Sequence, residues 1–344
     1  MKINRSELIS HLTKAKTAFA QKSILVSKEV FVFTGSEICS FGENISVSTP
    51  FTTDFKCAID GNNLIKVISN LTSEVVDINL KDSKLLIVGG KARASLYLED
   101  DFTYSPLDRD DIISKGIDIP QDFKEAISFC SISVSKVALD GVMQNIFIED
   151  DIMASSDNFR ISEFTMTSKI DGSILVPGVS IVEVMKYDIK SYLVDGKSHI
   201  YLIDKDKAIF LVNLVIGDFP RYEDILDSIS MKKKVIFPEQ FVEKVNAASI
   251  FIQQEDNSKE IKVTIQKDKI VCDSTNEVGS ICIDTDVTQQ DKQAYQGSFT
   301  VNPIYLKDIL QHVNTAVTAY VDNNKLYFQD KQFKHLICLI IDNA

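Results

Sequence analysis

The chain has 344 residues, a length that suits two or three domains of ordinary size. With 44% hydrophobic and 25% charged residues it has the composition of a globular protein, which excludes the disordered and fibrous classes. The formal net charge of −12 excludes a protein that coats itself over nucleic acid by bulk charge, although a local basic surface stays possible.

Apolar runs in the sequence are short. None approaches the roughly 20 residues of a membrane span, and residues 1–5 lack the apolar core of a signal peptide. We therefore expect a cytoplasmic protein.

Six helix starts recur along the chain. Asn4, with Glu7 three residues later, and Asp60 have the character of N-caps. Four prolines are expected in the first turn of a helix, where the missing N–H costs nothing: Pro120, Pro177, Pro238 and Pro303. The starts near residues 4, 61, 120, 177, 238 and 303 predict a repeat of about 60 residues.

The second, fourth and sixth helices share one apolar stripe at i, i+3 and i+4, made by Leu64, Val67, Ile68, Ile181, Val184, Met185, Leu306, Ile309 and Leu310. Each is followed by a predicted hairpin, with strands over 75–80 and 84–88, 199–203 and 207–215, and 318–321 and 325–329. A module is therefore one helix with three to four strands.

Two modules are expected to form one domain, because one helix on a small sheet buries too little surface alone. Asp101-Phe102-Thr103-Tyr104 and Gly217-Asp218-Phe219-Pro220-Arg221-Tyr222 mark the ends of the first two pairs. The sequence thus predicts three α+β domains of one fold, each with two helices on antiparallel sheets, over residues 1–115, 116–232 and 233–344.

Candidate chemistry is sparse. The six cysteines stand singly, mostly in apolar runs, so we interpret them as reduced core thiols, with no metal and no cofactor. The best enzyme candidates are the acidic or Ser-Asp clusters at 99–101, 149–151 and 155–157, at strand ends or turns where acids are ordinarily solvated. No glycine-rich phosphate loop is present, and the four histidines suggest no triad. We expect no catalytic activity. A β-rich structural protein is a weaker alternative, because it would lack regularly spaced helices.

The repeat, the Gly217–Tyr222 motif, Leu175-Val176-Pro177 opening a helix, and the loop from Ala154 to Ile161 resemble the bacterial DNA polymerase III beta sliding clamp family. The resemblance covers essentially the whole chain. It implies a head-to-tail homodimer that closes into a ring around duplex DNA and tethers the replicative polymerase. The implied partners are double-stranded DNA, the polymerase catalytic subunit, a clamp loader and other repair and replication proteins, in the cytoplasm and on nucleoid DNA.

A ring that encircles DNA has to slide along it. A few separated lysines on an acidic protein give the weak attraction to phosphates that sliding allows, and readout of base edges is not expected. The cations that lie off the apolar stripe of each helix give the expected DNA-facing set: Lys14, Lys66, Lys124, Lys186, Lys190, Lys244 and Lys307. Each could equally be the wet face of an ordinary amphipathic helix.

The resemblance also implies an apolar pocket for a short peptide of a client protein. Its expected residues are Met143, Ser156, Asn158, Phe159, Arg160, Ile161, Leu336, Ile337, Cys338, Leu339, Ile340 and Ile341. Chain termini usually fray, so an apolar run this close to one is expected to be pinned, although about half of these residues would also suit the buried face of a last strand.

Two departures from the family pattern concern this pocket. Asn158 and Phe159 stand where the family usually has Gly and His, and Cys338-Leu339-Ile340-Ile341-Asp342 replaces Met-Pro-Met-Arg-Leu. The divergence suits an unusual bacterial lineage or a phage genome, and a phage-encoded, clamp-like scaffold for replication proteins is the alternative function. The sequence identifies neither the dimer seam nor the polymerase that is served.

Overall fold

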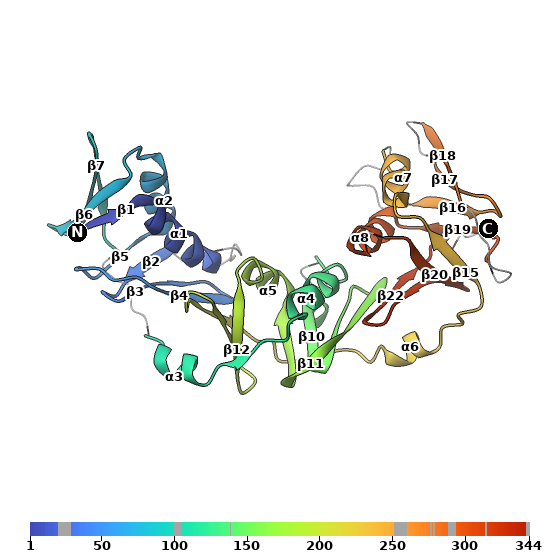
Figure 1. Ribbon diagram of the computed structural model, residues 1–344, viewed down its shortest axis with the longest axis horizontal. Helices are drawn as coiled ribbons and strands as arrows, with labels where there is room; N and C mark the ends of the chain where they lie inside the picture. The colour runs from blue at the N-terminus through green and yellow to red at the C-terminus, as the bar shows by residue number, and fades with distance from the viewer. Residues whose placement is uncertain are drawn as a thin grey trace. The chain divides into compact units, whose positions relative to one another are not determined.

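The computed structural model describes residues 1–19, 29–99, 105–137, 139–250, 260–275, 277, 279–287, 294–313 and 315–341. The chain divides into two compact units (Figure 1). Unit 1 contains Met1–Gln121 and Ile174–Gly217, and unit 2 contains Asp122–Ser173 and Asp218–Ala344. The predicted motif at 101–104 lies outside the described residues, as do residues 342–344.

Unit 1 has two antiparallel sheets. One sheet has the order β1 (Lys2–Asn4), β6 (Val75–Lys81), β7 (Lys84–Gly89) and β8 (Ala92–Tyr97). The other has the order β5 (Cys57–Asp60), β2 (Val30–Phe33), β3 (Glu37–Phe41), β4 (Ile45–Pro50), β14 (Ile209–Asn213), β13 (His199–Asp204), β12 (Ile189–Asp195) and β9 (Ile117–Asp118). The pairing of β4 with β14 joins strands more than 150 residues apart in sequence.

The helices of unit 1 are α1 (Arg5–Lys16), α2 (Gly61–Asn70), α3 (Arg109–Ser114) and α5 (Gly178–Val184), with the 3-10 turn η1 (Thr17–Phe19) after α1. Asn4 caps α1 by accepting the N–H groups of Ser6 and Glu7, and Asp60 caps α2 by accepting that of Asn63. Both predicted caps are therefore confirmed.

Unit 2 also has two antiparallel sheets. One has the order β10 (Asn145–Ser156), β11 (Arg160–Pro177), β22 (Phe333–Cys338), β21 (Lys325–Gln329), β20 (Val317–Asp322) and β15 (Lys234–Phe237). The other has the order β18 (Ser280–Asp286), β17 (Lys269–Thr275), β16 (Ile261–Ile265) and β19 (Gly297–Val301). Strand β11 is long and its last residues belong to unit 1.

The helices of unit 2 are α4 (Phe123–Ser131), α6 (Glu223–Asp227), α7 (Phe241–Ala248) and α8 (Pro303–Val313), with the 3-10 turn η2 (Gly141–Gln144) before β10. Helices α7 and α8 contact each other, as α1 and α2 do in unit 1 (Figure 1). The predicted stripe on α8 is buried, with Leu306 and Ile309 at 0% exposure. This burial against the sheets is the main source of each unit's stability.

The repeat of about 60 residues is present in the order of the elements. Helices α1, α2, α4, α5, α7 and α8 open the successive modules, and the predicted hairpins are observed as β6–β7, β13–β14 and β20–β21. The short connecting helices α3 and α6 were not predicted.

Two of the four proline predictions are wrong in detail. Pro303 begins α8 and Pro177 is the N-cap residue of α5, but α4 and α7 begin three residues after Pro120 and Pro238. The Phe241 N–H donates to the Pro238 carbonyl at 2.9 Å, so a turn separates this proline from its helix. The missing N–H is harmless in such a turn as well.

Candidate functional sites

Of the predicted cations, Lys66, Lys124, Lys244 and Lys307 lie on the helices α2, α4, α7 and α8, whereas Lys186 follows the end of α5 and Lys190 lies in β12. The side chains of Lys66, Lys124, Lys186 and Lys190 are exposed, and Lys244 and Lys307 are half-buried. Lys66, Lys124, Lys244 and Lys307 form no ion pair with a described residue. Their charge is therefore available to an anionic partner.

Two members of the predicted set already have acidic neighbours. Lys186 lies 2.5 Å from Glu183 and Lys190 lies 2.7 Å from Asp188. Both lysines are more than half exposed, so these pairs contribute little to stability and exchange readily for other anions.

The structure corrects the assignment of Lys14. Its ammonium group lies 2.5 Å from Asp204 and 2.7 Å from Asp206, and its side chain is only 11% exposed. Burial lowers the pKa of Lys14, but the hydrogen bonds to the two carboxylates outweigh it, and the net shift is upward. Lys14 therefore holds α1 against the turn between β13 and β14 and is not available to DNA.

Sequence reasoning placed Lys14 on the wet face of α1 because its two carboxylate partners are 190 and 192 residues away. The only signal was Asp204-Lys205-Asp206 itself. Such acids in a turn are usually solvated, so the signal did not identify a partner.

The second candidate site lies in unit 2, at the turn between β10 and β11. The Asp157 carboxylate accepts the N–H groups of Phe159 and Arg160 at 3.1 and 3.0 Å. Asn158 has a φ of +70°, a left-handed conformation that asparagine tolerates better than most residues. Asparagine is thus compatible with the turn in which the resembled family usually has glycine.

The buried Arg160 links the turn between β10 and β11 to α8. Its guanidinium donates to Asp157 at 2.8 Å and to Asp308 of α8 at 2.7 Å, and lies 4.2 Å from the centroid of the Tyr305 ring. The side chain is 4% exposed. Sequence reasoning missed Tyr305 and Asp308, because the first turn of α8 carries no signal that it meets this loop.

The twelve predicted pocket residues separate into two groups. Asn158, Phe159, Ile340 and Ile341 are exposed, and Met143 and Cys338 are half-buried. The remaining six are buried: Ser156, Arg160, Ile161, Leu336, Ile337 and Leu339.

The buried group forms the interior beneath the surface, which corrects its assignment to the lining of the pocket. Ile161 and Leu336 belong to a buried cluster with Ala154, Tyr222, Leu226, Ile229 and Tyr327. The reason is that the buried cluster and α8 both pack against the sheet that contains β22. The interpretation of a last strand's buried face is correct for Leu336 and Ile337, which lie on β22.

The segment after β22 is pinned by its backbone, as predicted. The N–H groups of Cys338, Leu339 and Ile340 donate to the carbonyls of Phe159, Asn324 and Thr300 at 2.7, 2.7 and 2.8 Å. This places Ile340 and Ile341 at the surface with a defined backbone path.

Four exposed apolar side chains and the half-buried Tyr305, from three segments, occur in this region, and we call them the Phe159 surface: Phe159, Ile304, Tyr305, Ile340 and Ile341. Phe159 is 59% exposed and Ile341 65% exposed. The rings of Phe159 and Tyr305 stack at 6.5 Å. Such a group of apolar side chains is typical of a site that binds another chain.

The enzyme alternatives gain no support from the geometry. In the cluster at 149–151, Asp150 pairs with Lys169 at 3.0 Å and both side chains are exposed. Ser162 and His335 lie 2.9 Å apart, with Ser133 2.7 Å from Ser162, but all three are 0% exposed. No substrate reaches a serine and histidine in the core of the sheet.

The cysteines are free thiols, and five of the six are buried or half-buried. Burial raises the pKa of Cys39, Cys57 and Cys272 to about 12, which keeps these thiols protonated. Cys282 is the exception to the predicted core position, because it points outward from β18. In the described part of the chain, no group of three His, Cys, Asp or Glu residues is placed to hold a metal ion.

Across the described ranges, no helix has the length and apolar character to cross a membrane.

No protein-family model matches the chain. In sequence it is 22% identical over 230 residues to the beta sliding clamp of Helicobacter pylori, in each of two strains. The match covers 63% of this chain, and it spans 59% of the length of these curated relatives.

Solved structures match over nearly the whole chain. A putative DNA polymerase III beta subunit from Eubacterium rectale has a TM-score of 0.84 at 20% identity, with 100% of this chain and 99% of that chain covered. The DNA polymerase sliding clamp from Bacillus subtilis has a TM-score of 0.82 at 15% identity, with 99% and 98% covered. The Helicobacter pylori beta clamp bound to a DNA ligase peptide has a TM-score of 0.80 at 15% identity, with 99% of each chain covered. The chain therefore has the sliding-clamp fold, and the predicted resemblance is confirmed at low sequence identity.

Proposed function

We propose that this chain is the subunit of a sliding clamp that encircles duplex DNA and tethers a DNA polymerase, without catalytic activity of its own. The observation that carries the proposal is the sixfold repetition of one helix-and-sheet module with the fold of bacterial clamps. In five of the six modules, a cation of the predicted set lies on or just after the opening helix, off its buried stripe. We place this clamp in the cytoplasm, on the DNA of a bacterium or a phage-infected host.

The proposed DNA contact is electrostatic and independent of sequence. Lys66, Lys124, Lys186, Lys190, Lys244 and Lys307 form the proposed set after Lys14 is removed. A few separated lysines give a salt-dependent attraction to phosphates, while the overall charge of −12 discourages binding along the outer surface. The clamp is then held by its topology rather than by affinity.

We retain the division into three domains over 1–115, 116–232 and 233–344, now with a rule for how they join. The last strand of the second module in one domain pairs with a strand of the first module in the domain before it. This rule describes β14 with β4, and β22 with β11. It leaves β8 and β18, which are edge strands in their sheets.

We infer that β8 of one copy pairs with β18 of a second copy, which closes a homodimeric ring and covers two edges otherwise open to aggregation. Arg93 on β8 and Asp284 and Asp286 on β18 are exposed, so the two edges carry opposite charge. An antiparallel register that puts Arg93 beside Asp284 also puts Ser95 beside Cys282.

This seam is tested by cysteine cross-linking. Ser95→Cys is expected to form a disulfide with Cys282 of the second copy under mild oxidation, because opposed residues in antiparallel strands have Cβ atoms about 5 Å apart. Ala94→Cys is the matched control, since residue 94 faces the other side of β8. A dimer in which Ser95→Cys gives no cross-link, or in which Ala94→Cys gives as much, contradicts the proposed register.

The Phe159 surface is the proposed site for client proteins, among them the polymerase, a clamp loader and repair proteins. The related clamp from Helicobacter pylori was solved with a DNA ligase peptide bound. Because Phe159, Ile340 and Ile341 present apolar surface in a fixed backbone setting, we expect the client segment to be a short peptide with apolar side chains.

Retention on circular DNA tests the function itself. A clamp loaded on nicked circular DNA is expected to stay bound and to be lost when the circle is linearised, because it can slide off an end. Light scattering is expected to give a mass near twice 38.5 kDa. A dimer that does not distinguish circular from linear DNA favours the scaffold alternative, and a monomer contradicts the ring.

A further inference from the structure

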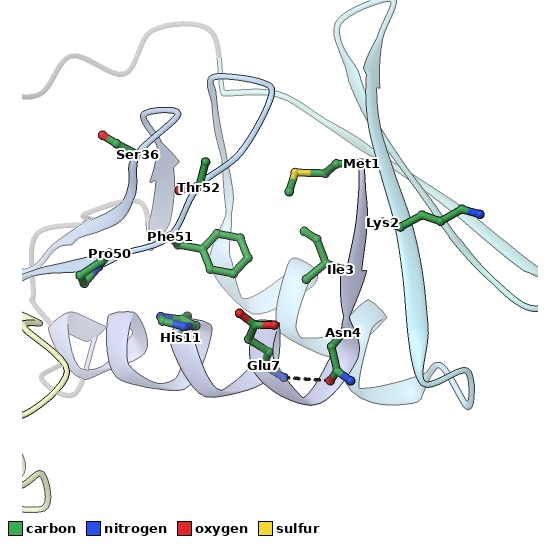
Figure 2. Close-up of a pocket in the computed structure, with 10 residues that line it drawn as sticks. All are labelled: Met1, Lys2, Ile3, Asn4, Glu7, His11, Ser36, Pro50, Phe51 and Thr52. Carbon is green, nitrogen blue, oxygen red and sulfur yellow. Dashed lines mark hydrogen bonds between the residues drawn. The ribbon is translucent and has the colours of Figure 1, made fainter.

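A pocket of about 400 Å³ opens beside α1 in unit 1 (Figure 2). Its volume falls within the range usual for ligand sites, about 300–1,000 Å³. It is lined by Met1, Lys2, Ile3, Asn4, Glu7, His11, Ser36, Pro50, Phe51 and Thr52. None of these residues belongs to the proposed DNA contact or to the Phe159 surface.

The pocket has an apolar floor. Ile3 and Phe51 are each 7% exposed, and Figure 2 shows both side chains turned toward the space above α1. The rings of Phe51 and His11 lie 5.1 Å apart and are tilted by 54°. An aliphatic or aromatic stem therefore has a surface to pack on.

Glu7 supplies an unpaired negative charge beside this floor. Its side chain is exposed and points toward Phe51 in Figure 2, and the carboxylate has no hydrogen bond or ion pair with a described residue. The nearby cations do not neutralise it. Lys2 points away from the pocket, and the Met1 ammonium donates to the Ile78 carbonyl at 2.7 Å.

His11 completes the wall without adding positive charge. Its Nδ1 lies 2.9 Å from the Thr49 hydroxyl, which fixes the ring. Burial and the neighbouring Lys14 lower the pKa of His11, so the imidazole is neutral near pH 7. Glu7 and His11 are only two potential metal ligands, and within the described residues no third acidic, histidine or cysteine side chain completes a metal site with them.

We propose that this pocket binds an arginine side chain of a partner protein, with the guanidinium against Glu7 and the aliphatic stem on Ile3 and Phe51. A guanidinium forms strong bonds with a carboxylate and stacks on aromatic rings. The net charge of −12 also favours the approach of a basic segment. The inference does not rest on the proposed clamp function, because it uses other residues.

A titration followed by NMR tests the proposal on the full chain. The probe is N-acetyl-arginine methylamide, and the reporter is the imidazole signal of His11, one of four histidines. We expect a saturable shift, weakened about tenfold in Glu7→Gln because the charge-assisted bond is lost. Glu43→Gln, an exposed glutamate in the same unit, is the matched control and is expected to bind as the parent does.

N-acetyl-norleucine methylamide supplies the neutral stem alone and is expected to give no saturable shift. The proposal is overturned if the arginine probe gives none either, if Glu7→Gln binds as tightly as the parent, or if the neutral probe binds equally. Because the titration contains no DNA, its failure leaves the clamp proposal standing.

Discussion

Two strand pairings among the described residues join strands more than 150 residues apart, and they have the same backbone plan but different side-chain chemistry. We call the pairing of β4 with β14 in unit 1 junction 1, and the pairing of β11 with β22 in unit 2 junction 2. In each, a short helix lies near the end of a predicted domain: α3 at junction 1 and α6 at junction 2.

Junction 1 is crossed by buried charges. Lys14 of α1 is held by Asp204 and Asp206, and Arg109 of α3 lies 3.6 Å from Glu37, which is 7% exposed. Lys14 holds α1 against the β13–β14 hairpin, and Arg109 joins α3 to β3 through Glu37 and to that hairpin by donating to the Lys207 carbonyl at 2.5 Å. Their geometry has to be good, because each buried charge has lost its water.

Junction 2 has a mainly apolar interior, with one ion pair between the buried Glu163 of β11 and Lys334 of β22 at 2.8 Å. Its connecting helix places Leu226 in the buried cluster that contains Ile161 and Leu336. The buried His335, which is neutral, lies 2.9 Å from the hydroxyl of Ser162 on β11. The guanidinium of Arg160 lies at the edge of the junction 2 interior, beneath the Phe159 surface.

The comparison shows that strand pairing, rather than a particular set of side chains, defines the repeated architecture. Any side chains suffice that fill the space and pair the buried polar groups. This explains how two junctions of one chain share a backbone plan while their sequences have diverged.

The largest expected effect comes from the apolar interior of junction 2. Leu336→Ala should lower the free energy of unfolding by about 3 kcal/mol, because it leaves a cavity among fully buried neighbours. Urea denaturation of this variant and of Ile341→Ala measures the difference. Ile341 is 65% exposed, so a similar loss in both variants would mean that the cluster is not tightly packed.

A smaller effect is expected at junction 1. Lys14→Met should cost about 2 kcal/mol, since it leaves the buried Asp204 without its counter-ion, with only the N–H groups of Asp206 and Ala208 as donors, while the half-exposed Asp206 carboxylate regains water. Lys66→Met, on the exposed face of α2, is the control and should change the free energy of unfolding by less than about 0.5 kcal/mol. Equal losses would contradict the structural role assigned to Lys14.

The smallest expected effect is on how the free energy of unfolding changes as pH falls. The histidine at junction 2 is expected to contribute more to this change than the histidine at junction 1. Burial, with help from Arg160 and His312, holds the pKa of His335 well below its ordinary value of 6.5. Below that value the unfolded chain binds a proton that the folded chain does not, so stability is present above 6.5 and is lost as pH falls.

The loss approaches about 1.4 kcal/mol per pH unit for one such histidine. His335→Gln should therefore flatten the decline of the free energy of unfolding between about pH 7 and pH 5. His11→Gln should flatten it less, because the pKa of His11 is lowered by less complete burial at junction 1. If His11→Gln removed the larger part, the contrast between the junctions would be wrong.

The fold was predictable where its signals are local. Caps such as Asn4 and Asp60, the stripe of Leu306 and Ile309, and the hairpin at 325–329 depend on residues within one turn of each other, so periodicity identifies them. Two of the four proline predictions, at Pro120 and Pro238, failed by three residues, because a turn and the first turn of a helix both favour proline.

The sites were predictable only in part, because their contacts are distant in sequence. The exposed Phe159 and Ile341 were found, but half of the predicted pocket is buried beneath them. Tyr305 and Asp308 were missed, and Lys14 was misplaced by partners on another hairpin. No pattern in one sequence gives the pairing of β4 with β14, which determines those partners.

Arg160 has an evolutionary consequence. One guanidinium satisfies a carboxylate in its own loop and another 148 residues away, and it is almost completely shielded from water. Replacing Arg160 alone removes the guanidinium partner of Asp157 and of Asp308. Replacing Asp308 alone leaves the Arg160 guanidinium with one of its two carboxylate partners. Among relatives of this chain, these two positions should covary, and an alignment in which they drift independently would identify lineages that have rebuilt this surface.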